Sequence, residues 1–206
     1  MNSIEHMFLF RLNKSGDLIW ERIFPNDQAW KIIKTTDNNY LAMGVFANLV
    51  KFNINGDTLW KRGPFDAYNF TAIKEVNNGG YVVCGAQLIG FNLFPYLLRI
   101  NSSGDILWER TYTNGIFEGV YNDLIVENES FVIGANISDS GFISRKLSIL
   151  KTDTSGNIIW TQKYDSLQYH TIESMIRMPD GSYIIGGGNN NFVSKFDQNG
   201  GILWLK

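Results

Sequence analysis

The sequence is poor in the residues that build disulfides and metal sites. It contains one cysteine, Cys84, and two histidines, His6 and His170, among 206 residues. A single cysteine excludes a disulfide within the chain, and the apolar run Tyr81-Val82-Val83-Cys84 predicts a buried small hydrophobe rather than a reactive thiol. Two histidines, one of them near the amino terminus, argue against a histidine-based metal site.

Long apolar runs and an excess of basic charge are also missing. No segment approaches the ~20 apolar residues of a membrane span, and residues 1–6 do not have the pattern of a secretion signal. This favours a cytoplasmic location, although a mature or excised fragment of an extracellular protein would have the same sequence. The formal net charge of −2 and the pI near 5.7 argue against nucleic acid as a partner.

Recognisable catalytic motifs are absent as well. Asp165, Ser166 and His170 lie close together in sequence, but nothing around them resembles a nucleophile elbow. No glycine-rich phosphate loop follows a strand and opens a helix. We therefore expect a protein that is not an enzyme and that needs no cofactor.

What the sequence has in abundance is a repeated turn followed by tryptophan. Each copy places Asn or Asp, two spacers, glycine, three residues and tryptophan in the same order. The Asx side chain can bond backbone amides two residues on, and the glycine can adopt positive φ, so each copy predicts a β-hairpin with a short, bulged loop. The copies begin at Asn13, Asn53, Asn101, Asp153 and Asp197 and end at Trp20, Trp60, Trp108, Trp160 and Trp204.

A second hairpin is predicted between consecutive tryptophans. Runs such as Phe70–Val76 and Tyr81–Ala86 flank a turn at residues 77–80, and comparable turns occur at 37–39, 128–130 and 179–182. Each repeat therefore has four strands, which we name A to D, with the tryptophan on strand D. The tryptophans lie 40 to 52 residues apart, the range expected for one β-propeller blade.

These units predict an all-β fold, a β-propeller of four complete four-stranded blades and an N-terminal half-blade. Strand B is apolar on consecutive residues, which predicts burial on both faces between stacked blades. Small residues at its end, such as Gly85 and Gly187, allow a close backbone approach near the axis. The half-blade covers residues 7–24, the blades cover about 27–63, 68–112, 119–164 and 170–206, and together they make a single domain, 1–206.

The repeat resembles those of Trp-containing β-propeller proteins. The resemblance rests on a Lys or Arg two residues before the Asx turn, on the glycine and tryptophan, and on a later Asp/Asn-Gly turn with a Tyr-led apolar run, as at Tyr81 and Tyr183. It looks most like repeats of large secreted bacterial surface proteins and more distantly like quinoprotein-type propellers. It covers nearly the whole chain and implies the fold, while propellers host many activities.

Four and a half units leave open how the propeller closes. A roughly five-bladed ring, in which residues 7–24 form an incomplete blade, is one arrangement. In the others, the half-blade pairs with a neighbouring chain in an oligomer, or the sequence is a fragment or structural repeat of a larger propeller protein.

The repeated turn has functional and structural interpretations. It resembles a calcium loop but offers fewer oxygens than the ~6 to 8 ligands of Ca²⁺, so we expect structural turns and no metal. The basic residue before each turn could contribute to an anion site. Alternatively, it could pair with a carboxylate or carbonyl of the neighbouring blade or lay its stem along apolar surface, and we expect one of these structural roles. These residues are Arg11, Lys51, Arg99, Lys151 and Lys195.

The connections from strand D to A and from B to C emerge at one end of the blades, the loop end. They are variable and rich in aromatic residues, and function is common on such loops. If the rings are exposed, Tyr68→Ala, Tyr96→Ala and Phe117→Ala should leave the melting temperature nearly unchanged, whereas loss of core rings should lower it. Our candidate binding residues are Phe65, Asp66, Tyr68, Phe91, Asn92, Phe94, Tyr96, Asn114, Phe117, Glu118, Phe142 and Tyr169.

Two partner classes fit exposed aromatic rings beside amides and carboxylates. Tyr and Phe anchor protein interfaces, and rings also stack on sugars while amides bond their hydroxyl groups. A lectin of this fold would repeat its loop aromatics from blade to blade, whereas those found here, such as Phe65, Phe94 and Phe117, are only loosely equivalent. The sequence therefore predicts a non-enzymatic module that binds a protein partner, with lectin-like carbohydrate binding as the alternative.

Overall fold

The strands of the chain form five antiparallel sheets. A computed structural model describes residues 6–25, 29–44, 47–77, 79–113, 118–138, 145–168, 171–188 and 191–206. Within them one sheet has two strands and four sheets have four strands, each in sequence order. No helix in these ranges has the length and apolar character needed to cross a membrane. The predicted half-blade and four complete blades are confirmed.

The described strands fall into the half-blade and the four complete blades. The half-blade is β1 (His6–Leu12) and β2 (Leu18–Pro25). Blade 2 is β3 (Ala29–Lys34), β4 (Tyr40–Gly44), β5 (Leu49–Phe52) and β6 (Thr58–Arg62), and blade 3 is β7 (Asn69–Glu75), β8 (Tyr81–Ile89), β9 (Asn92–Ile100) and β10 (Ile106–Thr111). Blade 4 is β11 (Glu118–Val126), β12 (Ser130–Ser138), β13 (Arg145–Asp153) and β14 (Ile158–Gln168), and blade 5 is β15 (Thr171–Arg177), β16 (Tyr183–Gly188), β17 (Phe192–Phe196) and β18 (Ile202–Leu205).

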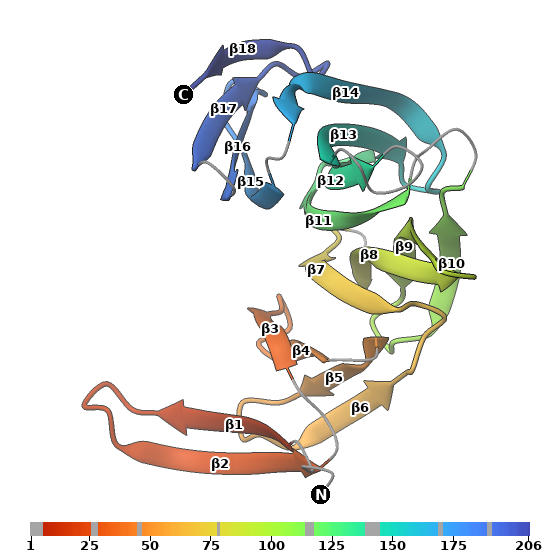
Figure 1. Ribbon diagram of the computed structural model, residues 1–206. Helices are drawn as coiled ribbons and strands as arrows, with labels where there is room; N and C mark the ends of the chain where they lie inside the picture. Colours follow the sequence, from red (N-terminus) through yellow and green to blue (C-terminus); the bar gives the residue numbers. More distant parts are fainter. Residues whose placement is uncertain are drawn as a thin grey trace, which may run out of the picture.

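The five sheets follow one another along an arc (Figure 1). The A strands β3, β7, β11 and β15 lie on its inner side, and the D strands lie toward the outside. The half-blade forms one end of the arc and blade 5 the other, and the two ends stand apart (Figure 1). The ends of the arc therefore differ from its middle, where every blade has a neighbour on both sides.

The turn between strands C and D has the predicted chemistry in every unit. Asn101 Oδ1 accepts hydrogen bonds of 2.9 Å from the backbone N–H groups of Ser103 and Asp105, and Gly104 has a φ of +84°. The other four turns repeat this pattern. The Asx oxygen bonds its own backbone, as predicted for a structural hairpin turn.

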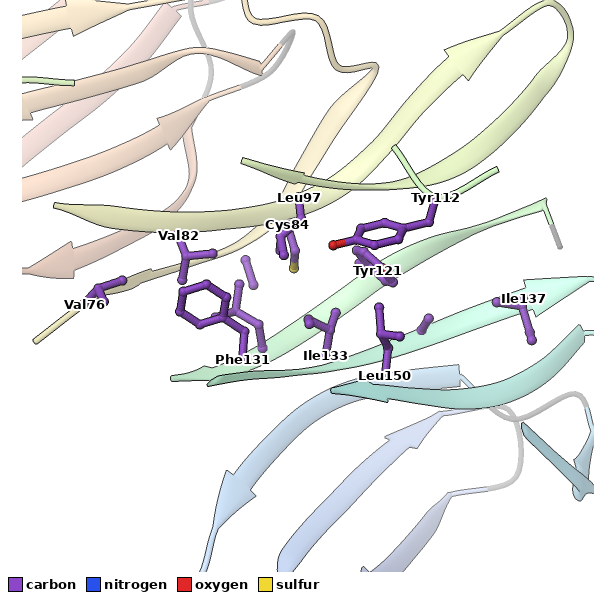
Figure 2. Packing of buried hydrophobic residues seen from close by; sticks show 13 residues of the cluster. Val76, Val82, Cys84, Leu97, Tyr112, Tyr121, Phe131, Ile133, Ile137 and Leu150 are labelled. Carbon is purple, nitrogen blue, oxygen red and sulfur yellow. The ribbon is translucent and has the colours of Figure 1, made fainter. Parts of the chain in front are cut away.

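Apolar clusters between successive blades form the core. In the largest, Cys84 and Leu97 of blade 3 face Phe131 and Ile133 of blade 4 (Figure 2), and all four side chains are fully buried. Burial raises the pKa of the Cys84 thiol to about 12, so the thiol stays protonated at neutral pH. The prediction of a buried, unreactive cysteine is confirmed.

The burial pattern along a strand shows whether its blade has one neighbouring blade or two. In β4 and β8, every apolar residue from Leu41 to Met43 and from Tyr81 to Cys84 is buried, as predicted for strand B. In β1 and β17, exposed residues alternate with less exposed ones. A strand with one covered face has this period of two, so the half-blade and blade 5 each keep a free face.

Candidate functional site

Every inner strand carries a β-bulge at the same point. In β7, for example, Phe70 pairs with Gly85 and Ala72 pairs with Cys84, so Thr71 is an extra residue. Bulges re-aim side chains and are common beside binding sites. The corresponding extra residues of the four blades are Trp30, Thr71, Asn122 and Glu173.

The small residues predicted at the end of strand B make room for this bulged backbone. A Cβ added to Gly85 would lie 2.1 Å from the carbonyl oxygen of Asn69, and one added to Gly187 would lie 1.7 Å from that of Thr171. Both contacts are impossible for a side chain, so the prediction of a close backbone approach is confirmed. The approaching backbone is strand A of the same blade.

Two of the bulge residues, Thr71 and Asn122, line a pocket of about 340 Å³ that blades 3, 4 and 5 share. The pocket lies at the loop end, because Asn69 and Thr171, which also line it, begin their inner strands. The side-chain oxygens of Asn69 and Asn122 are buried and accept no hydrogen bond from any described residue. Buried acceptors without a donor are costly, so these amides are suited to a ligand that brings N–H or O–H groups.

The other groups of the pocket wall are neutral. They include hydroxyl groups of Ser138 and Thr171 and apolar side chains of Leu93 and Ile137, with no charged side chain from the described residues. Asn136 also lines the wall, and its Oδ1 accepts a 3.0 Å bond from the backbone N–H of Ile172. Such a surface can recognise an uncharged polar group by hydrogen bonds and its apolar edge by packing.

The buried carboxylate next to Asn122 in the sequence already accepts hydrogen bonds within the fold. Asp123 on β11 is 4% exposed, and it accepts bonds of 2.9 Å from its neighbour's N–H at Leu124 and 2.8 Å from the N–H of Met175 on β15. Lys31 of blade 2 reaches toward it across the inner side of the arc, with Nζ 3.9 Å from Oδ1. Asp123 therefore ties inner strands together. In the described ranges no three His, Cys, Asp or Glu side chains gather as metal ligands.

The basic residues before the turns are paired, mostly within their own blade. Lys51 binds Asp37 at 2.6 Å and Lys195 binds Asp180 at 2.8 Å, in each case at the A–B turn of the same blade. Lys151 binds Glu127 in the same way, at 2.7 Å. Arg11 does reach the neighbouring blade, at the carbonyl oxygen of Ile54. These basic residues are paired, but the expectation of a carboxylate on the neighbouring blade is wrong for Lys51, Lys151 and Lys195, whose carboxylate partners lie in the same blade.

Among the predicted loop residues that the structure describes, Phe91 and Tyr68 are the exposed rings. Phe91 is 98% exposed at the turn between β8 and β9, and Tyr68 is 55% exposed just before β7. Both adjoin the pocket in sequence, since Asn69 and Leu93 line it. Exposed Asp66 accepts a 2.6 Å bond from Gln87 Nε2, and Gln87 in turn accepts one from Thr111. The loop before β7 is thus attached to the rest of blade 3.

Tyr96 was wrongly expected to be a loop residue. It is 1% exposed, its ring packs 6.4 Å from that of Phe70, and its hydroxyl donates a 2.5 Å hydrogen bond to Glu109 Oε2. The error arose because the segment 91–96 was taken as a long connection. Residues 92–96 are instead the first half of β9, which makes a tight hairpin with β8.

The remaining predicted residues have mixed positions. Phe65 is partly buried and packs 5.7 Å from the ring of Phe70, while Asn92 and Phe94 are partly exposed in β9. Glu118 is the first residue of β11. The other four candidates, Asn114, Phe117, Phe142 and Tyr169, lie outside the described residues. The pocket residues Asn69, Thr71 and Asn122 were not predicted, although the small residues Gly85 and Ala135 opposite them were the available signal.

Comparison with known proteins supports the fold. No protein-family model matches the chain, and no curated protein matches its sequence. Similar solved structures include the Dos1 propeller, with a TM-score of 0.59 and 13% identity over 95% of this chain and 50% of that one. The WD40 β-propeller domain of Doa1 has a TM-score of 0.61 and 17% identity over 90% of this chain and 56% of that one. The C-terminal WD40 domain of Sif2 has a TM-score of 0.53 and 12% identity over 100% of this chain and 66% of that one. The chain thus spans half to two thirds of the length of these propellers. At such identities the likeness concerns the fold alone: the chain has the β-propeller fold.

Proposed function

We propose that this chain is a non-enzymatic binding module that recognises a protein partner at the loop end of blades 3 to 5. The observation that carries the proposal is the pocket in which the side-chain oxygens of Asn69 and Asn122 are buried and accept no hydrogen bond from a described residue. The exposed ring of Phe91 lies two residues before Leu93, which lines the same pocket. A peptide offers the matching groups, because its N–H donors can satisfy the amides while an apolar side chain packs on Phe91 and Tyr68.

Among the described residues, the chemistry of this site is not repeated from blade to blade. The extra residues of the four bulges are Trp30, Thr71, Asn122 and Glu173, so the equivalent positions have different chemistry. A composite surface with unlike walls suits one irregular partner, such as a protein. The resemblance to repeats of secreted bacterial surface proteins is compatible with this role and remains part of the proposal.

Lectin-like carbohydrate binding is the second candidate. It is favoured by the neutral wall of amides and hydroxyl groups, which can bond sugar hydroxyls, and by the exposed ring of Phe91, on which a sugar face can stack. It is disfavoured by the lack of repetition between blades. The two candidates use the same residues, so the probe rather than the variant must separate them.

The test presents the purified chain to a library of displayed peptides and to a glycan array. Two variants accompany it: Phe91→Ala, which removes the exposed ring, and Asn122→Ala, which removes a pocket oxygen. Trp30→Ala is the matched control, since Trp30 is 65% exposed on a bulge of blade 2 and does not line this pocket.

Peptide binding that both variants weaken about 10-fold or more, and that the control retains, would support the proposal. Glycan binding with the same dependence would establish the lectin-like alternative. Binding that neither variant changes, or no binding by a folded sample, would reject this site.

A further inference from the structure

The same tryptophan hydrogen bond joins the half-blade to blade 2, blade 2 to blade 3 and blade 3 to blade 4. The indole N–H of Trp20 donates to the carbonyl oxygen of Ile54 at 2.9 Å, and that of Trp108 donates to Thr154 at 3.1 Å. In both cases the acceptor follows the Asx residue of the next C–D turn. The ring also lies over the glycine of that turn: a Cβ on Gly56 would be 3.0 Å from atoms of the Trp20 ring.

A charge pair accompanies this contact in the first blades. Arg22, two residues after Trp20, lies 3.7 Å from Asp57, the last residue of the next turn, and Arg62 lies 3.4 Å from Asp105 in the same way. Each guanidinium also lies 5.8 Å from the ring of its own tryptophan. One surface of a blade therefore presents tryptophan and a cation, and the opposite surface of the next blade presents a glycine turn and an acid.

Blade 5 presents the first of these surfaces, and no described residue of another blade covers it. Trp204 is 39% exposed, and Lys206 Nζ lies 5.8 Å from its ring, in the place of the arginines. Ile176, Ile184 and Trp204 lie in one cross-sheet row with Lys195 between the last two, and Ile176 is 55% exposed. In blade 4 the equivalent apolar residues, Ile125, Val132 and Trp160, are covered by blade 5.

The half-blade presents the second surface. Its turn, from Asn13 to Asp17, has the same hydrogen bonds as the others, but a Cβ on Gly16 would meet no atom within 4 Å. On the same free face Phe8 is 61% exposed and Phe10 is 63% exposed. In β17 of blade 5, Phe192 holds the position equivalent to Phe8 and is 3% exposed, because it packs against blade 4.

We propose that blade 5 of one copy of this chain docks head to tail on the half-blade of a second copy. Trp204 then lies over Gly16 and donates to the carbonyl oxygen of Lys14, and Lys206 faces Asp17. The charges match those of the two internal pairs, and the apolar rows are the two halves of an interface that the chain already forms between its own blades.

A second copy is the occupant that the geometry favours. The two surfaces stand apart in one chain (Figure 1), so they do not meet without a second molecule or a large change in the arc. They are also unlike each other, which makes the contact heterologous, and such contacts produce closed rings or open chains of subunits.

The test is the molar mass by multi-angle light scattering over a range of concentrations. We expect a mass that rises above 23.4 kDa with concentration. Trp204→Ala should raise the dissociation constant about 10-fold or more, because it removes the central ring of the interface. Asp17→Lys and Lys206→Asp should each weaken association by juxtaposing like charges, and the double charge exchange should restore it. Phe91→Ala is the control, because this exposed ring lies on neither surface.

A monomer at every concentration would overturn the proposal. So would association that Trp204→Ala and Asp17→Lys leave unchanged, since the copies would then meet elsewhere. If each single charge variant weakens association and the double charge exchange does not restore it, the pairing of Lys206 with Asp17 is also contradicted. If Phe91→Ala weakens association, the loop end takes part in it. That result would contradict this interface but would not contradict the proposed binding site.

Discussion

The indole Nε1 of Trp60 donates a 3.1 Å hydrogen bond to the carbonyl oxygen of Ser102, which lies in the C–D turn of the next blade. The Trp60 ring packs in the apolar cluster between the two blades, with its centroid 6.4 Å from that of Tyr81. One side chain thus carries both polar and apolar parts of the blade contact.

Trp108→Ala should lower the free energy of unfolding by about 3 kcal/mol, because it empties space beside Phe131 and leaves the carbonyl oxygen of Thr154 without its donor. Trp204→Ala is the matched control, and in dilute solution it should cost less than about 1 kcal/mol, since no blade covers that ring. Urea unfolding measures both. Equal losses would mean that the tryptophan acts within its own blade rather than between blades.

Gly104→Ala should be more destabilising than Gly16→Ala, although both glycines have positive φ, +84° and +89°. The backbone strain of about 1 kcal/mol is common to the two. Only at position 104 does the new Cβ also meet a neighbouring atom, Arg62 Cγ at 2.7 Å. We therefore expect Gly104→Ala to lower the free energy of unfolding by about 1 to 2 kcal/mol more than Gly16→Ala does. Thermal unfolding of the dilute proteins compares them, and identical losses would show that Arg62 moves aside freely.

Tyr96→Ala should lower the free energy of unfolding by about 3 to 4 kcal/mol, because Tyr96 is buried and stacked on Phe70. Phe91→Ala, five residues earlier in the same hairpin, should change it by less than about 0.5 kcal/mol, because that ring is 98% exposed. Calorimetry of the two variants measures the difference. A small effect at Tyr96 would return this residue to the candidate binding surface.

Glu127→Gln should change the dependence of stability on pH. Burial alone raises the pKa of Glu127, but hydrogen bonds from Lys151, Ser130 and Tyr183 outweigh it and lower the pKa from 4.5 to about 2. The carboxylate therefore stabilises the folded state above pH 4.5, and this contribution is lost as the pH falls toward about 2. After allowance for solvent screening, we expect Glu127→Gln to cost about 2 kcal/mol at pH 7.

The control for this variant is Glu129→Gln, two residues on in the same turn, where the side chain is exposed. Unfolding in urea at several pH values should show the gap between wild type and Glu127→Gln closing between pH 4.5 and 2. A gap that stays constant over this interval would mean that the glutamate contributes by packing rather than by charge.

The strand order and the turns could be predicted from the sequence because their causes are local. The Asn101 side chain bonds its own backbone, and Gly104 adopts positive φ whatever lies around the turn. Consecutive apolar residues in strand B likewise indicated burial on both faces before any neighbour was known. Five copies of the same turn followed by tryptophan were enough to indicate a propeller.

The candidate site depended on distant contacts and was predicted only in part. Phe91 and Tyr68 were identified as exposed rings, but Tyr96 was misplaced because a run of six residues can be a loop or half of a hairpin, and only pairing with β8 decides which. The bulges that direct Thr71 and Asn122 into the pocket were not predicted either. The only sign of these bulges in the sequence is a small residue on the facing strand.

The sequence by itself determined the repeat, its turns and the burial of strand B, because each follows from the preferences of neighbouring residues. Only the tertiary structure decided what lies beside each blade. Trp60 and Trp204 occupy the same place in the repeat, yet one is packed against the next blade and the other is exposed at the end of the arc. Burial is a property of what packs against a side chain, and identical repeats therefore acquire different roles at the middle and at the ends of the molecule.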